Sequence, residues 1–190
     1  MTIAAPRINT VSTTLITGDE LLELGDIGPC ELIDGRIVPM PPAGDEHGTI
    51  EFSLGGELRN FVRHHKLGRI TGGETGIYIR RKPDRIRAAD IVFLSTSRAG
   101  DRPGKGFLEV APDLIVEIMS PTDRWQDVRQ KLADYFSIGV QWVWVVEPDN
   151  RAVLVYRSLA DVTVLGEADV LRGEGVLEGF EMAVRDVFEG

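Results

Sequence analysis

The chain has 190 residues, 43% of them hydrophobic and 27% charged, and 21 basic residues against 30 acidic ones give a formal net charge of −9. This length and composition predict a single globular domain over residues 1–190. No apolar run reaches the length of a membrane span, residues 1–11 lack the pattern of a signal peptide, and the single cysteine excludes an internal disulfide. We therefore expect a cytoplasmic protein with no membrane partner, and the acidic charge argues against a surface coated by nucleic acid.

The N-terminal part predicts an arm, a short helix and a hairpin. Residues 1–14 are polar and show no periodicity, so we expect a loose arm there. Thr17 is a typical N-cap for a short helix that ends at Gly25. Asp34-Gly35 is the strongest short hairpin signal in a sequence, and it predicts a hairpin over residues 31–38.

A long helix is expected next, from Asp45 to about Lys66, with Gly68 as its terminator. One face carries apolar residues at helical spacing, namely Ile50, Leu54, Leu58, Phe61 and Val62. Two short strands should follow at 69–71 and 77–79, separated by glycine-rich turns.

The second half of the chain predicts a parallel pair of strands. After a basic loop at 80–87, an apolar strand is expected over 88–94. Strand 114–119, helix 124–138 and strand 141–146 form a β-α-β unit, in which the two strands should be parallel. The earlier strands are linked by hairpins, so the fold class is α/β with a mixed central sheet, and the two longer helices should cover its faces.

One carboxylate, Glu117, interrupts the buried strand Leu114 to Met119. A charge inside a buried strand is costly unless another group pairs with it. A structural ion pair and a metal ligand or general base explain this residue about equally well, and the strand alone does not separate the two.

A second carboxylate, Asp90, opens the strand at 88–94, and the two acids can meet if their strands are neighbours. Two carboxylates that share a site repel each other unless a cation lies between them, and their oxygen ligands suit Mg²⁺ or Mn²⁺. Lys131, one turn into the following helix, is the candidate cation for phosphate chemistry. We place it on a different helix face from Leu132 and Tyr135, and its alternative interpretation is an ordinary solvated lysine.

Together these stretches resemble a known family. The resemblance is carried by Ala89-Asp90-Ile91-Val92-Phe93, by Pro112 to Ser120, and by Lys131, Tyr135 and the run Gly139 to Val146. They are similar to the Uma-two family of putative restriction endonucleases, within the PD-(D/E)XK nuclease superfamily. The resemblance implies a restriction endonuclease-like fold with an N-terminal hairpin, and a Mg²⁺-dependent or Mn²⁺-dependent endonuclease acting on DNA.

The active site of that superfamily can be carried over residue by residue. The resemblance implies Asp90 and Glu117 as metal ligands, the main-chain carbonyl of Ile118 as the third metal-binding group, and Lys131 as the catalytic lysine. Two positions depart from the superfamily pattern. Ala89 stands where a proline usually precedes the aspartate, and Met119 stands where a lysine usually follows the acid. Activity would then require Lys131 to reach the site from its helix.

Other residues have less certain positions in this scheme. His47, at the start of the long helix, matches a histidine common in the family and is a further catalytic candidate, although local hydrogen bonding explains it equally well. An additional carboxylate could come from Glu46, Glu51, Glu57 or Glu74.

Two clusters of basic residues could attract DNA. We expect the first to bind nucleic acid beside Asp90, and it comprises Arg80, Arg81, Lys82, Arg85 and Arg87. The second would help to steer the backbone, and it comprises Arg59, Arg63, His64, His65, Lys66 and Arg69. A solvated surface is the alternative for each.

The sequence therefore favours a metal-dependent phosphodiesterase that hydrolyses DNA. Its main alternative is a catalytically degenerate, nuclease-like binding module, which Met119 and the acidic net charge favour. A metal hydrolase for a small phosphate ester is the third hypothesis. Apolar strands and the hairpin near 31–38 suggest a homodimer.

Overall fold

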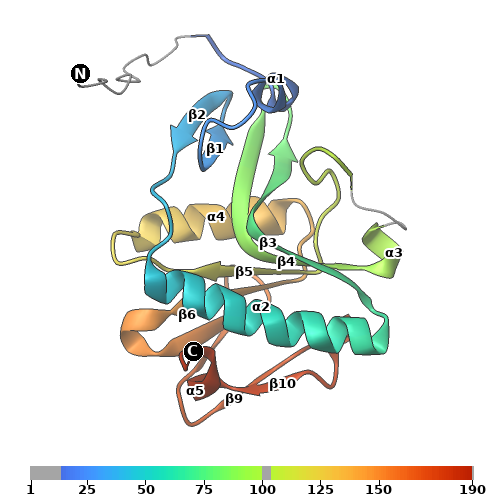
Figure 1. The fold of residues 1–190 in the computed structure, drawn as a ribbon, viewed down its shortest axis with the longest axis vertical. Helices are drawn as coiled ribbons and strands as arrows, with labels where there is room; N and C mark the ends of the chain where they lie inside the picture. Colours follow the sequence, from blue (N-terminus) through green and yellow to red (C-terminus); the bar gives the residue numbers. More distant parts are fainter. Residues whose placement is uncertain (1–13, 100–103, 190) are drawn as a thin grey trace, which may run out of the picture.

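A computed structural model describes residues 14–99 and 104–189, so the predicted arm lies almost entirely outside the described residues. An eight-stranded mixed sheet forms the centre of the molecule (Figure 1), with the strand order β2-β1-β4-β5-β6-β7-β8 and with β3 paired to β4. A separate two-stranded sheet, β9-β10, lies near the C-terminus.

The strands of the main sheet are β1 (Cys30–Ile33), β2 (Arg36–Pro39), β3 (Gly68–Arg80), β4 (Arg85–Ser95), β5 (Leu114–Ile118), β6 (Trp142–Glu147), β7 (Ala152–Tyr156) and β8 (Val162–Leu165). The small sheet comprises β9 (Val170–Arg172) and β10 (Glu181–Ala183). The α-helices are α1 (Gly18–Glu23), α2 (Asp45–His65), α3 (Thr96–Ala99), α4 (Trp125–Ser137) and α5 (Val184–Val187), and two 3₁₀ turns, η1 (Pro148–Asn150) and η2 (Gly175–Leu177), complete the fold. No described helix combines the length and the apolar character needed to cross a membrane.

The predicted N-terminal elements are confirmed. Thr17 caps α1 in a capping box, in which its side chain accepts from the Glu20 amide while the Glu20 carboxylate accepts from Thr17. The hairpin turns at Asp34 and Gly35, which both have positive φ angles of 54° and 76°. These angles match the type I′ turn that an Asp-Gly pair favours.

The prediction for α2 is confirmed except at its end. Lys66, and not Gly68, adopts the left-handed conformation that terminates the helix. The two short strands predicted at 69–71 and 77–79 are one long strand, β3. Its register against β4 shifts between Gly72 and Thr75, so the glycine-rich stretch forms a β-bulge within the strand and not a turn.

The expected β-α-β unit is present, because β5 and β6 pair in parallel and α4 connects them. Strand β4 begins at Arg85, several residues before the predicted start, so the basic loop shrinks to a tight turn before it. Antiparallel pairing joins β4 to β5 and β6 to β7, which makes the sheet mixed as predicted.

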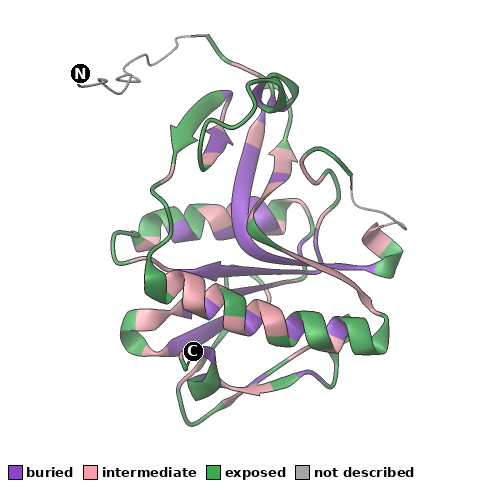
Figure 2. Ribbon diagram, in the orientation of Figure 1, coloured by how far each residue is buried: buried purple, intermediate pink, exposed green. Residues whose placement is uncertain are grey.

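The two longer helices cover opposite faces of the sheet, as predicted (Figure 1). On one face, the α2 residues Ile50, Leu54 and Leu58 share a core with Ile91, Val116 and the C-terminal elements. On the other, Val128 and Leu132 of α4 pack with Ala89, Val92 and Ile115. Figure 2 shows the result, with β4 and β5 buried between helices whose outer sides are exposed.

Candidate active site

The polar centre of the molecule lies where the pairing of β4 with β5 stops. The last pair is Ile91 with Val116, so the next residues along the two strands, Asp90 and Glu117, are neighbours across the sheet. The β3 bulge also lies here, because Gly73 and Glu74 fall between the partners of Ile91 and Ala89. With the strands parted, polar side chains from both helices reach the sheet at this point.

Asp90 is held by the end of β5 and by the start of α2. Its Oδ2 accepts a hydrogen bond of 2.6 Å from the Ile118 amide, and the Nε2 of His47 lies 3.4 Å from the same oxygen. The N–H and C=O groups of one residue in an extended strand point to the same side. The Ile118 carbonyl, predicted as a metal-binding group, therefore faces the side on which Asp90 lies.

Glu117 is buried, and both of its carboxylate oxygens have donors from α4. Lys131 Nζ lies 2.8 Å from Oε2, and the Tyr135 hydroxyl donates to Oε1. Burial, reinforced by the charge of Asp90, raises the pKa of Glu117 to about 7, although Lys131 and Tyr135 oppose the shift.

Lys131 lies inside the site and not on a solvated helix face. Its side chain is only 23% exposed, and Nζ contacts Glu117, the Ala88 carbonyl at 3.4 Å and Glu31 Oε1 at 3.7 Å. Burial acts to lower the pKa of Lys131, but the carboxylates of Glu117 and Glu31 outweigh it and the pKa is raised. The ammonium form is therefore strongly favoured.

Two members of this network were missed or misplaced by sequence reasoning. Tyr135 shares a face with Lys131, because residues four apart are neighbours on a helix, so our placement on different faces was wrong. The spacing of four residues between Lys131 and Tyr135 would have been enough to predict that both side chains reach Glu117. Glu31, from the hairpin, accepts from the Ala88 amide and from Arg87 as well as approaching Lys131. No local pattern identified Glu31.

His47 is close to Asp90 through Nε2, while its buried Nδ1 has no hydrogen-bond partner among the described residues. The hydrogen bond to Asp90 raises the pKa of His47, with burial opposing it. His47 therefore brings an imidazole from α2 to the edge of the site, and its catalytic role stays a prediction.

The additional carboxylates divide into two groups. Glu51 accepts a hydrogen bond of 2.7 Å from the Gly73 amide. The pKa of Glu74 is raised, mainly by burial and then by the nearby charges of Asp90 and Glu51. These two residues surround the bulge beside Asp90. Glu46 and Glu57 are exposed on α2. Among the described residues, no group of three or more His, Cys, Asp or Glu side chains forms a ready metal cluster.

The donor set instead fits a divalent ion held by few protein ligands. Asp90 and Glu117 supply two carboxylates, and a carboxylate retains acceptor capacity after accepting one hydrogen bond at each oxygen. Mg²⁺ typically binds through one or two carboxylates and keeps several waters. A pair of neighbouring acids with a main-chain carbonyl on the same side matches the few protein ligands that such an ion takes, without a third acidic side chain.

The five basic residues predicted to bind nucleic acid are not all available to a ligand, because four of them form ion pairs. Arg87 is buried between Glu31 and Asp134, and Arg85 pairs with Asp34 and Asp134. Arg80 also pairs with Asp34, and Arg81 with Glu109. Only Lys82 is exposed with no ion pair to another described residue. We therefore revise the assignment of this loop: Arg85 and Arg87 are largely buried in ion pairs, and the exposed Arg80 and Arg81 already have acidic partners.

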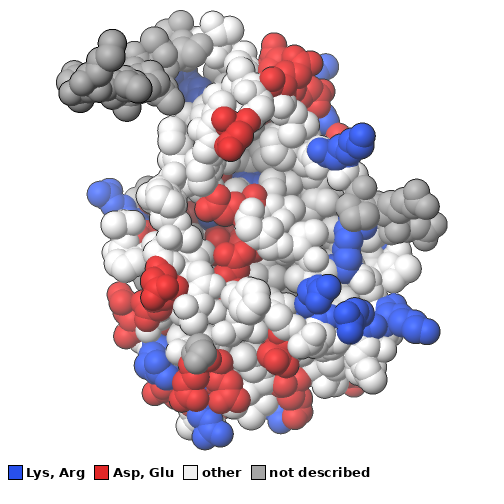
Figure 3. Space-filling view, viewed as in Figure 1, with Lys and Arg blue, Asp and Glu red and all other residues white. Residues whose placement is uncertain are grey.

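Charge on the face that carries the site is arranged differently from our expectation. Figure 3 shows acidic side chains in the middle of this face, whereas Lys and Arg gather toward the C-terminal end of α2. Arg59, Arg63 and Lys66 are exposed there and form no ion pair within the described ranges.

This fold and site define the class of restriction endonuclease-like proteins. A family described as "Putative restriction endonuclease" (Uma2) matches residues 19–185, and the chain belongs to this family. A crystal structure of a "putative nuclease belonging to DUF820" from Anabaena variabilis ATCC 29413 is similar, with a TM-score of 0.77 and 24% identity over 91% of this chain and 97% of that one. That likeness shows the fold. A search of curated proteins found no match. Family membership supports a nuclease-like function.

Proposed function

We propose that the protein is a Mg²⁺-dependent endodeoxyribonuclease, with Mn²⁺ as an alternative metal. The observation that carries this proposal is the convergence of two carboxylates and one lysine from three separate elements, β4, β5 and α4, with Lys131 Nζ 2.8 Å from Glu117. The same convergence makes the site a reasonable replacement for the superfamily arrangement, in which the lysine stands at the position of Met119.

Each side chain has a distinct role in this proposal. Asp90 and Glu117 would hold the metal together with the Ile118 carbonyl. Lys131 orients the attacking water and offsets the charge that develops on the phosphate. Tyr135 and Glu31 position Glu117 and Lys131, whose contacts fix both charged groups before substrate arrives. His47 holds a proton near Asp90, where it can exchange with a phosphate oxygen or a water.

The metal would supply charge neutralisation at the phosphate and a lowered pKa for a bound water. Both contributions matter here because Asp90, Glu117, Glu51 and Glu74 make the unliganded site acidic. A DNA phosphate would otherwise be repelled from this centre.

A non-catalytic binding module is the competing function. The observation that favours it is the closed network around Glu117, whose two oxygens already have donors in Lys131 and Tyr135. Such a network stabilises the fold even without catalysis. A cleavage experiment separates the two functions.

The test measures cleavage of plasmid and single-stranded circular DNA with Mg²⁺ for wild type, Asp90→Asn and Lys131→Met. We expect both variants to lose about a hundredfold or more in rate, because each removes a group that acts on the reacting phosphate. Lys105→Met, which changes an exposed lysine, should cleave like wild type. Equal rates for wild type and Lys131→Met would remove Lys131 from the active site.

Stability has to be measured beside activity, since Lys131 forms ion pairs with Glu117 and Glu31 and is not the ordinary solvated lysine of the alternative interpretation. Its removal leaves the buried Glu117 with one donor fewer. Adding Met119→Lys to Lys131→Met tests the replacement directly, because residues two apart on a strand share a face and position 119 lies on the Glu117 side. Partial recovery of cleavage would support catalysis. Recovery of stability alone would support the binding module.

A further inference from the structure

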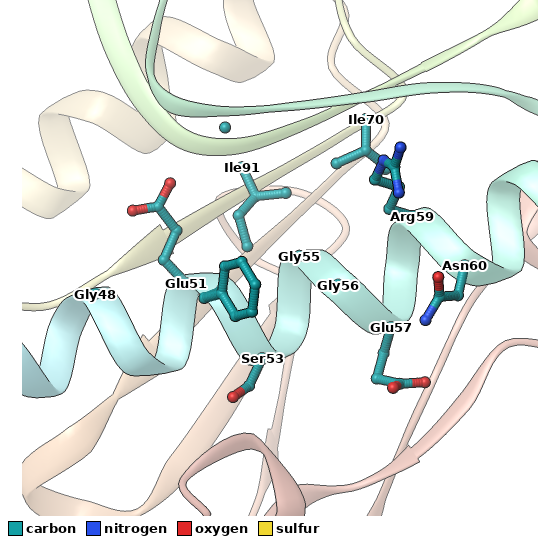
Figure 4. Close-up of a pocket in the computed structure, with 12 residues that line it drawn as sticks. Gly48, Glu51, Ser53, Gly55, Gly56, Glu57, Arg59, Asn60, Ile70 and Ile91 are labelled. Atoms are coloured by element: carbon teal, nitrogen blue, oxygen red, sulfur yellow. The ribbon is translucent and has the colours of Figure 1, made fainter. Parts of the chain in front are cut away.

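A groove of about 920 Å³ runs along α2 from the candidate active site. Its lining includes Glu51 and Gly72, which belong to the surroundings of Asp90, and it continues past Ile70 to Arg59 and Asn60. Figure 4 shows Arg59 on the side of α2 that faces Ile70, whereas Glu57 points to the opposite side. The groove therefore joins the acidic centre to the basic end of the helix.

An exposed aromatic ring stands in this groove. Phe52 is 85% exposed, far more than the other aromatic residues, and it lines the groove next to the site. Its helical neighbours at the i−4, i+3 and i+4 positions are all glycines, Gly48, Gly55 and Gly56. Thr49, at i−3, is the one helical neighbour of this set with a side chain, and the ring stays 85% exposed beside it.

Packing inside the molecule does not require these glycines. A Cβ atom added at Gly48 or at Gly56 would meet no atom within 4 Å, and at Gly55 it would make only ordinary contacts of 3.6–3.7 Å with Ile91. Glycine in a helix interior is destabilising relative to alanine. Three glycines around one exposed ring leave the faces of the ring accessible. They also lower the stability of the helix, and no packing contact within the described residues requires them.

Unpaired cations follow the ring along the same helix. Arg59 and Arg63 lie seven and eleven residues after Phe52, which places them on the same side of α2 at distances of about 10 and 16 Å along its axis. Both are exposed, and neither forms an ion pair with another described residue. An aromatic platform followed by a positive track is the combination that binds a polynucleotide strand without reading its sequence.

We infer that this groove seats a single strand of DNA, with one base stacked on Phe52 and the phosphates beyond it on Arg59 and Arg63. The inference rests on the proposed function, and it adds the strandedness of the substrate. In a duplex each base is stacked between its neighbours, so Phe52 could reach the face of a base only at the cost of unstacking it. An unpaired nucleotide leaves a face available, and the strand then continues along the groove to Asp90.

The test is the affinity of a fluorescent single-stranded oligonucleotide, measured by anisotropy in the Asp90→Asn background without divalent metal. We expect Phe52→Ala to weaken binding about tenfold, the usual effect of losing one base–aromatic stack, and Phe52→Trp to preserve it. Leu159→Ala, which removes a 58% exposed apolar side chain between β7 and β8, should bind like its parent. Duplex DNA should bind more weakly and should not respond to Phe52→Ala.

A second variant keeps the test independent of folding. Gly56→Leu improves helix propensity and places a leucine against the ring at i,i+4, so the melting temperature should rise by about 2–4 °C while single-strand affinity falls. Unchanged affinity in both Phe52→Ala and Gly56→Leu would overturn the inference. So would sedimentation of wild type as a dimer that Phe52→Ala converts to a monomer with unchanged DNA affinity, since a second copy would then occupy the groove.

The design separates this inference from the proposed function. Binding that depends on Phe52 in a protein that never cleaves DNA would refute the nuclease and leave the groove in place. Rapid cleavage of duplex DNA that Phe52→Ala does not alter would refute the groove and leave the nuclease in place.

Discussion

Two basic clusters of similar composition have opposite roles in this molecule. In the turn before β4 and the start of that strand, Arg85 and Arg87 point toward carboxylates of the hairpin and of α4 and are mostly buried. On the C-terminal half of α2, Arg59 and Arg63 have no carboxylate within ion-pair distance in the described part of the chain. The first cluster holds elements together, and the second remains available to anions.

The difference shows that a run of arginines acquires its role from the elements packed against it. Strand β4 lies beside β1 in the sheet, so the hairpin brings Glu31 and Asp34 to the arginines of β4. Within residues 14–99 and 104–189, the end of α2 leaves Arg59, Arg63 and Lys66 exposed. Charge density along the sequence is similar in both places, and only tertiary neighbours distinguish them.

The largest effect on stability should come from removing an arginine of the first cluster, whose side chains pair with buried carboxylates. Arg87→Ala leaves Glu31 and Asp134, which it bridges, with reduced pairing in a buried position. We expect a loss of about 3 kcal/mol or more in the free energy of unfolding, measured by urea denaturation. Arg63→Ala, an exposed arginine from the other cluster, should stay within about 0.5 kcal/mol of wild type. Equal losses in the two variants would mean that the comparison is wrong.

A second effect of similar kind concerns Glu117, whose burial raises its pKa from 4.5 to about 7. Between pH 4.5 and about pH 7, Glu117 keeps its proton in the folded protein but has released it in the unfolded chain. The free energy of unfolding therefore falls as the pH rises through this range and levels off above it. The full contribution is about 3 kcal/mol.

Glu117→Gln cannot lose that proton. Unfolding curves in EDTA should therefore show wild type losing stability relative to Glu117→Gln from about pH 4.5 to pH 7. A relative gain of wild type over the same range would show that the donors Lys131 and Tyr135 dominate over burial and hold the pKa of Glu117 low.

A smaller effect should appear in DNA binding. Each phosphate contact to a single strand contributes about 0.7 to the slope of log affinity against log salt. The double variant Arg59→Ala/Arg63→Ala should lower the slope by about 1.4. Arg80→Ala/Arg81→Ala is the matched control and should leave the slope unchanged, since both arginines already have acidic partners. The reverse result would restore the β4 turn as the DNA-binding element.

Much of this architecture could be read from the sequence. Local signals were sufficient for the hairpin at Asp34-Gly35, for α2 and for the parallel β5-α4-β6 unit. The family resemblance indicated Asp90, Glu117 and Lys131 as candidates, and the fold brings these three residues together. Periodicity could not show that the glycine-rich stretch around Gly73 is a bulge inside one strand, because a bulge depends on its partner strand.

The remaining features depend on contacts between distant positions. Glu31 reaches Lys131 across 100 residues of sequence, and the burial of Arg87 depends on Glu31 and Asp134. Phe52 was also not recognised as a functional candidate, although its position two residues after Ile50 places it off the apolar face of α2; its 85% exposure became clear only in the structure.

The central claim is that Asp90 and Glu117 share a divalent ion, and calorimetric titration of Mg²⁺ tests it most directly. Wild type and Glu46→Ala, which removes an exposed acid from the start of α2, should bind one ion with the same affinity. Asp90→Ala should lose that binding while its unfolding curve shows an intact fold. Mg²⁺ binding to Asp90→Ala with wild-type affinity, or no binding to the wild type, would contradict the account.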